Sequence, residues 1–252
     1  MSFDVAADAY DDFMGRYSRL LAGQMADLAD VRSGQRVLDV GCGPGALTAE
    51  LVRRLEPGSV AAVDPSRPFV EAARVRYPGV NVQEASAEKL PFPDQTFDVV
   101  LAQLVIHFMA DPVAGLAEMA RVTRRGGVVA ACVWDHGGGQ GPLSLFWQAA
   151  RELNPGVEDE SQFPGAREGN LAKLFEAAGI HDLVETVVAA DLEHPSFEDW
   201  WEPFTRGVGP AGSYVADLGA EQRGQLRNAC RRLLPAGSFV LPARAWAVRG
   251  LA

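Results

Sequence analysis

The sequence is short of cysteine, of positive charge and of long apolar runs. Its three cysteines in 252 residues, Cys42, Cys132 and Cys230, are far apart. They form neither a disulfide framework nor a zinc-binding pattern. We therefore expect a reducing, cytoplasmic environment and no metal site.

Basic residues are outnumbered by acidic ones, 23 to 33, which gives a net charge of −10. Such a balance disfavours sequence-independent binding to the nucleic-acid backbone, which needs basic surface. No stretch is long and apolar enough to span a membrane, and the N-terminus lacks the basic flank and apolar core of a signal peptide. We expect no nucleic-acid and no membrane partner, a small molecule as the ligand, and a monomer or homodimer.

What the sequence does contain is a regular alternation of short apolar runs and amphipathic segments. Strands are expected at 37–40, 59–63, 80–84, 97–102 and 128–133, with helices at 46–55, 68–77 and 113–122 between them. This alternation is typical of an α/β fold with a doubly wound, mostly parallel sheet. Further along, helices are expected at 143–153, 170–178, 197–204 and 220–234, and strands at 183–190 and 243–248.

These elements suggest one domain in three parts. Residues 36–190 and 243–252 are expected to form the α/β core, and residues 191–242 a helical cap inserted into it. Residues 1–35 are expected to be helical. They form either an amphipathic cover for the sheet or a lid whose Tyr10, Arg16 or Tyr17 closes over a ligand.

A glycine turn stands between the first strand and the first helix of the core, with Gly41, Gly43 and Gly45 at alternate positions. Glycine permits unusual backbone angles and close approach of a ligand, and the turn leads into the free amides of a helix N-terminus. The spacing matches neither the dinucleotide-binding fingerprint nor the P-loop. A ligand without a pyrophosphate is favoured, and a plain tight turn is the alternative.

Asp64 ends the second strand, a little more than 20 residues after the glycine turn begins. An acid at this distance is the expected partner of ribose hydroxyls in open α/β sheets. The alternative is a turn acid at the start of the next helix.

Four segments together resemble the class I S-adenosylmethionine-dependent methyltransferases, in the small-molecule branch called methyltransferase type 11: Val37–Gly45, Ala62–Ser66, Ala87–Phe92 and Phe97–Val100. The resemblance is strong over about residues 33–133. It implies a seven-stranded sheet whose last strand is antiparallel. It also implies binding of S-adenosylmethionine, with S-adenosylhomocysteine as the product.

The resemblance also implies roles for particular residues. Asp39 would orient the glycine turn, Gly41 and Gly43 would pass under the methionine part of the cofactor, and Asp64 would hold the ribose. The cofactor-binding residues expected are Tyr17, Asp39, Gly41, Cys42, Gly43, Asp64, Pro65, Ser86, Ala87, Glu88, Gln103 and Leu104. Of these, Ser86–Glu88 would line the adenine, and Gln103 and Leu104 would lie near the sulfonium. Many relatives carry an aspartate where Ser86 stands, which puts the adenine contact in question.

The activity implied is methyl transfer by in-line displacement to an unidentified small-molecule acceptor. Such catalysis depends mainly on positioning, and a base is needed only if the nucleophile must lose a proton.

His107 and His136 are the candidate bases, with His107 placed first. For both, the alternative is a histidine that holds structure or lines the pocket without proton transfer. His136, Trp134 and Trp201 are expected in the acceptor pocket, and ordinary core of the cap is the favoured alternative for Trp201. His181 and His194 are expected on the surface.

Two other activities stay open. One is a regulatory module that binds the cofactor without turnover, and the other is an enzyme that uses S-adenosylmethionine without transferring its methyl group. A nicotinamide-dependent oxidoreductase is disfavoured, because its glycine spacing differs.

Overall fold

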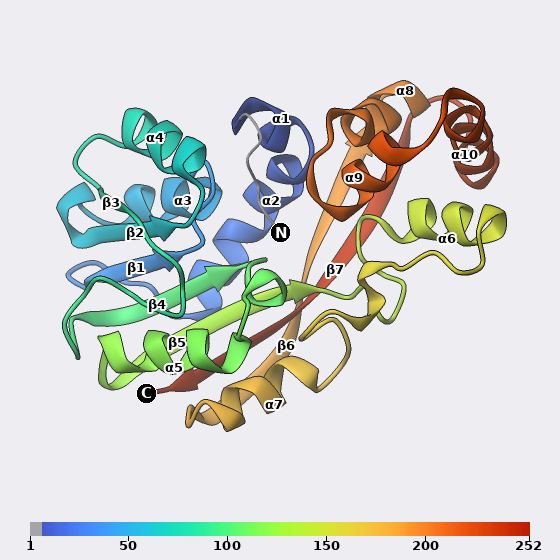
Figure 1. Ribbon diagram of the computed structural model, residues 1–252. Helices are drawn as coiled ribbons and strands as arrows, with labels where there is room; N and C mark the ends of the chain where they lie inside the picture. Colours follow the sequence, from blue (N-terminus) through green and yellow to red (C-terminus); the bar gives the residue numbers. More distant parts are fainter. Residues whose placement is uncertain (1–6) are drawn as a thin grey trace.

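The computed structural model describes residues 7–252, so residues 1–6 of the expected lid lie outside the described part. A seven-stranded sheet in the order β3-β2-β1-β4-β5-β7-β6 runs through the centre of the molecule (Figure 1). Its strands are β1 (Val37–Val40), β2 (Val60–Asp64), β3 (Asn81–Glu84), β4 (Phe97–Gln103), β5 (Thr123–Trp134), β6 (His181–His194) and β7 (Phe239–Leu251). β7 is antiparallel to both of its neighbours, while β1–β5 pair in parallel. The expected doubly wound sheet with its antiparallel last strand is confirmed.

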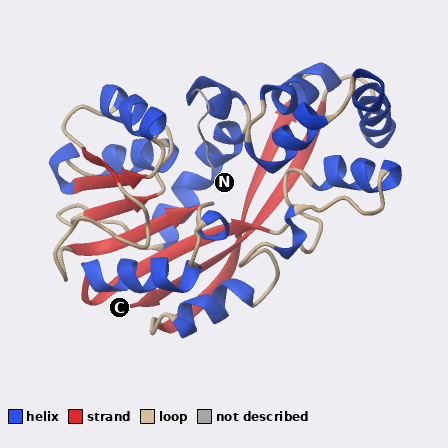
Figure 2. Ribbon diagram, in the orientation of Figure 1, coloured by secondary structure: helices blue, strands red, loops and turns tan. Residues whose placement is uncertain are grey.

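Helices cover both faces of the sheet (Figure 2). One face packs against α2 (Met14–Leu28), α3 (Ala46–Arg54) and α4 (Arg67–Arg76), and the other against α5 (Pro112–Val122) and α7 (Asn170–Ala177). The side chains of the central strand β1 point to both faces: Val37 packs on the α2 side, while Leu38 and Val40 pack on the α5 side. Its four residues are all buried, as expected of a parallel strand covered on both faces.

The start of α5 has a local cause in the sequence. Asp111 precedes Pro112, the first helical residue, and its side chain accepts a hydrogen bond from the backbone N–H of Ala114 at 3.0 Å. A carboxylate that caps a helix satisfies one of its free amides. The loop that follows β4 is therefore held in a defined position before the helix begins.

β6 and β7 are longer than their sequence patterns indicate. They pair from His181 with Leu251 to His194 with Phe239, with a register shift between His181 and Val184. Both strands extend beyond the rest of the sheet toward the cap helices (Figure 1). Four residues at the end of β6 and four at the start of β7 lie within the range 191–242 that was expected to be helical cap. Most residues of β6 are exposed, so the alternation of apolar and polar residues along it is weak. The sequence pattern therefore indicates a shorter strand than the structure shows.

The cap is built from two separate segments of the chain. α8 (Phe197–Trp201), the 3-10 helix η4 (Glu202–Arg206), α9 (Gly209–Asp217) and α10 (Ala220–Leu233) come from the expected insert. α6 (Ser144–Leu153) joins them, because Phe146 stacks on Phe204 at 4.5 Å between ring centroids. Sequence analysis did not predict α9, which opens with a glycine and a proline.

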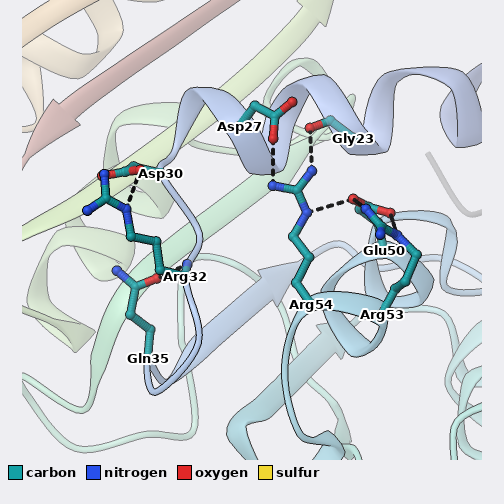
Figure 3. Close-up of polar contacts among 8 residues, drawn as sticks. All are labelled: Gly23, Asp27, Asp30, Arg32, Gln35, Glu50, Arg53 and Arg54. Atoms are coloured by element: carbon teal, nitrogen blue, oxygen red, sulfur yellow. Dashed lines mark hydrogen bonds and ion pairs between the residues drawn. The ribbon is translucent and has the colours of Figure 1, made fainter.

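The helix α2 is fixed at both ends. Arg54 of α3 donates hydrogen bonds to the Asp27 carboxylate at 2.6 Å and to the Gly23 carbonyl at 3.2 Å (Figure 3). Near its other end, Arg16 donates to Asp199 of α8 at 2.8 Å. α2 therefore connects the sheet layer to the cap. None of the helices in residues 7–252 combines the length and the apolar character needed to cross a membrane.

Candidate active site

The expected cofactor residues lie at one edge of the sheet, because the carboxyl ends of parallel strands meet there. The glycine turn follows β1, Asp64 ends β2 and is followed by Pro65, Ser86 comes shortly after β3, and Gln103 ends β4. Backbone bonds tie the strand ends together. The N–H groups of Gly41 and Cys42 both donate to the Val63 carbonyl, at 2.8 and 2.9 Å.

The three glycines of the turn all have positive φ, but their surroundings differ. A Cβ at Gly41 would lie 2.3 Å from Val105, and one at Gly45 would lie 2.2 Å from the Tyr77 ring. At Gly43 only the Tyr10 ring comes near among the described residues, at 4.0 Å. Gly41 and Gly45 are therefore required by packing, whereas Gly43 leaves its backbone open to a ligand. The Cys42 thiol is buried beside α4, so only the main chain of that residue belongs to this edge.

Asp64 is 7% exposed and fixes the turn from the neighbouring strand. One carboxylate oxygen accepts from the N–H of Gly43 at 2.8 Å, and the other accepts from the N–H of Ser66 at 2.8 Å. Burial raises the pKa of Asp64, and these two hydrogen bonds oppose the shift. Each oxygen keeps a further lone pair, so the carboxylate can also accept from a diol.

Asp39 lies beneath the turn and is 1% exposed. The Thr48 hydroxyl of α3 donates to its carboxylate at 2.6 Å. Burial raises the pKa of Asp39 to about 7, and the Thr48 hydrogen bond acts against it. Asp39 thus holds the start of α3 against β1, consistent with the orienting role that the resemblance implies.

The segment after β3, residues 86–88, was expected to contact the adenine, and its three side chains differ in exposure. Ser86 is exposed, Ala87 is buried, and the Glu88 carboxylate accepts from the backbone N–H of Ala110 at 2.8 Å. Glu88 therefore holds the loop before α5. Its carboxylate has a structural partner at the position where an adenine contact was expected.

The end of β4 carries two unusual features. Leu104 has a positive φ of 62°, which is rare for a branched side chain and typical of functional sites. The Gln103 amide donates to the Ser18 carbonyl at 2.9 Å, while its Oε1 is buried without a partner within residues 7–252. A buried acceptor of this kind requires a donor, and a cofactor at this edge could supply one.

Of the two lid tyrosines, Tyr10 is the one that approaches the glycine turn. It belongs to α1 (Ala7–Asp12) and lies opposite Gly43. The Tyr17 hydroxyl is instead directed to His194 at 3.2 Å, and its ring packs edge-on against Trp134. The structure therefore places Tyr17 in the contact between α2 and the end of β6.

A cavity of about 40 Å³ lies beside Leu104 and between the lid, the sheet and the cap. Most of its lining is apolar, and the expected pocket residues His107, His136 and Trp134 are all part of it. The two imidazole rings lie 6.1 Å apart, and both are buried. The structure thus brings the candidate base and two of the three expected pocket residues together.

Two expectations are wrong. Trp201 does not line this cavity; it is buried in the cap, stacked parallel to Phe197, because the short helix α8 turns its aromatic face inward. His194 is 3% exposed and not a surface residue. It lies between Tyr17 and Asp199, with its Nδ1 3.0 Å from the Asp199 carboxylate. His181 is exposed, as expected.

Sequence reasoning also missed Glu160, which lines the cavity from the 3-10 helix η3 (Glu160–Gln162). It is 3% exposed, and burial raises its pKa to about 7. Burial lowers the pKa of His136 to about 4 and that of His107 well below its usual range. Both imidazoles are therefore neutral at pH 7, and Glu160 titrates near neutrality.

This buried carboxyl gives a pH-dependent stability. The pKa of Glu160 is higher in the folded than in the unfolded protein. Its contribution to the free energy of unfolding is therefore fully present below about pH 4.5 and is lost as the pH rises through 7. Glutamine mimics the protonated form. We expect wild type to lose at least about 1 kcal/mol of unfolding free energy relative to Glu160→Gln between pH 5 and pH 8. Urea unfolding at both pH values measures this, and an equal pH dependence would contradict it. The histidines cancel in the comparison.

Comparison with known proteins is consistent with this geometry. Residues 38–131 match the methyltransferase domain family. An uncharacterized methyltransferase of Schizosaccharomyces pombe is 36% identical over 182 residues, which cover 65% of this chain and 64% of that protein. The chain thus spans slightly less than two thirds of that relative's length.

Solved structures share the fold at low identity. A SAM-dependent methyltransferase from Thermotoga maritima has a TM-score of 0.52 and 20% identity, covering 97% of this chain and 98% of that one. The [4+2]-cyclase SpnF has a TM-score of 0.56 and 17% identity, covering 92% and 81%. The domain match over residues 38–131 and the shared fold are both consistent with a class I S-adenosylmethionine-dependent methyltransferase.

Proposed function

We propose that the protein transfers a methyl group from S-adenosylmethionine to a small, mostly apolar acceptor. The observation that supports this best is the mostly apolar cavity beside Leu104, where the cofactor edge of the sheet meets the cap. Its small size and apolar lining suit a small molecule better than a polymer. The acidic chain is consistent with this choice.

The residues at the sheet edge fit the cofactor. The open side of Gly43 would admit the methionine part, and the lone pairs left on Asp64 would accept from the ribose hydroxyls. The unpartnered Oε1 of Gln103 would lie near the sulfonium, whose positive charge attracts its lone pairs. Ser86 and Ala87 would contact the adenine. When bound, S-adenosylmethionine supplies an activated methyl group on a good leaving group.

The protein's own contribution is then to position the acceptor and exclude water. Trp134 and Leu104 form the wall on the sheet side, and Phe13 and Val208 close the cavity from α2's N-terminal end and from the cap. Holding two reactants in line is worth roughly 7–11 kcal/mol of barrier in favourable cases. Positioning alone can therefore account for much of the rate.

Calorimetric titration tests the proposal. We expect S-adenosylhomocysteine to bind with micromolar affinity and NAD not to bind, because the glycine turn lacks the dinucleotide spacing. A mass-shift screen of acceptors would follow. Binding of NAD, or of neither ligand, would contradict the proposed cofactor.

A second function is kept open by the fold shared with the cyclase. An enzyme that uses the cofactor only for its charge would leave it unconsumed, and a regulatory module would bind it without any product. Release of S-adenosylhomocysteine during turnover separates methyl transfer from both.

A further inference from the structure

Among residues 7–252, Glu160 is the one carboxyl group on the cavity wall, and the family motifs do not include it. One of its oxygens accepts a hydrogen bond from the Trp147 indole N–H at 2.8 Å, which fixes the side chain from α6. Its other oxygen is 3.9 Å from Nε2 of His136. No lysine or arginine pairs with it within residues 7–252, so its charge is not neutralised by a partner.

Polar atoms around this carboxyl lack partners. His136 Nε2 and His107 Nδ1 are both buried without a hydrogen bond in the described part of the chain. A separation of 3.9 Å is too long for a hydrogen bond between Glu160 and His136. Because buried polar atoms are normally satisfied, these groups are suited to a ligand that enters between them.

A hydroxyl group fits this place best. It donates once and accepts twice, so it can donate to Glu160 while accepting from an imidazole N–H. A protonated amine would require the buried carboxylate to be ionised beside it. Burying such a pair costs more than its attraction returns unless further ligands are present. The neutral imidazoles and apolar walls supply no such charge compensation.

We propose that Glu160 is the general base that removes the proton from the acceptor, and that the acceptor is an apolar molecule bearing a hydroxyl group, such as a phenol. The inference rests on the proposed methyl transfer. His136 and His107 hold the hydroxyl oxygen, and Trp147 orients the carboxylate. Glu160 takes the role that the sequence suggested for His107. Burial raises the pKa of Glu160 to about 7 but lowers the pKa of His107 well below its usual range.

The atoms balance without a further reactant. As the new carbon–oxygen bond forms, the methyl–sulfur bond breaks and its electron pair stays on sulfur. The hydroxyl proton moves to the Glu160 carboxylate and is later released to solvent. The products are the methyl ether, S-adenosylhomocysteine and one proton.

The first test needs no acceptor. In protein labelled with ¹⁵N-tryptophan, the Trp147 indole N–H reports on the carboxyl that it contacts, and Trp147→Phe assigns its signal among the five tryptophans. We expect this resonance to titrate between pH 5 and 8 in wild type and in Glu158→Gln, an exposed neighbour, but not in Glu160→Gln. A pH-independent wild-type resonance would overturn the proposal.

The second test uses 4-nitrophenol, whose two protonation states differ in colour, added to protein saturated with S-adenosylhomocysteine. We expect a larger phenolate fraction of the bound probe in wild type and Glu158→Gln than in Glu160→Gln. A purely structural Glu160 would leave the fraction unchanged, and that result, or no binding of the probe, overturns the proposal. Calorimetry keeps the two hypotheses apart: absent S-adenosylhomocysteine binding in wild type refutes the proposed function, while intact binding with equal phenolate fractions refutes only the base.

Discussion

Replacing Gly41 with alanine is expected to lower the free energy of unfolding by about 2–5 kcal/mol. The residue has a φ of 69°, a conformation that costs a non-glycine residue about 1–2 kcal/mol. Its new Cβ would also lie 2.3 Å from one methyl group of Val105 and 2.6 Å from the other. Overpacking of this kind adds about 1–3 kcal/mol. Denaturant unfolding measures the change.

Two further variants separate strain from overlap. Gly34 also has a positive φ, 88°, but a Cβ there meets no atom of the described residues within 4 Å, so Gly34→Ala should show the strain alone. Adding Val105→Ala to Gly41→Ala removes the two methyl groups and should restore part of the loss. If Gly41→Ala were no worse than Gly34→Ala, the packing account of the turn would fail.

Replacing Asp64 with alanine is expected to weaken S-adenosylhomocysteine binding at least tenfold, about 1.4 kcal/mol. The change removes the acceptor offered to the ribose. It also leaves the N–H groups of Gly43 and Ser66 without the partners that now hold them at 2.8 Å. Both effects act on the cofactor edge of the sheet. Calorimetric titration gives the affinity directly.

Matched variants make this result interpretable. Asp64→Asn keeps an acceptor oxygen, so its loss should be smaller than that of alanine. Glu56→Ala removes an exposed acid elsewhere and should bind like wild type. Unchanged affinity in a folded Asp64→Ala protein would refute the ribose assignment.

Sequence alone anticipates features that are local in the chain. Three features are of this kind: the glycine turn, Asp64, and Asp111 at the N-terminus of α5. Each depends on neighbours a few positions away or on fixed strand spacing, and each has a recognisable pattern. The parallel sheet follows from the alternation of such units. These parts of the fold could therefore be predicted together with their order.

Features that depend on distant contacts could not be anticipated. His194 is buried because Tyr17, 177 positions away, lies against it. Glu160 becomes a cavity residue only because α6 folds back onto the cap and places Trp147 above it. The expectation for Trp201 fails for the same reason. The residues around it in the sequence do not tell whether a tryptophan packs in the core of the cap or lines the cavity.

The continuous pairing of β6 and β7 into the cap has a mechanical consequence. Because the ladder runs without a register shift from Val184 to His194, the end of the sheet continues directly into the cap. α1, by contrast, has no buried residue, although its Tyr10 lies over Gly43. Sparse burial is the mark of segments that open at low free-energy cost. Entry and exit of ligands would then depend on the opening of this short helix, while the paired strands β6 and β7 keep the cap in place.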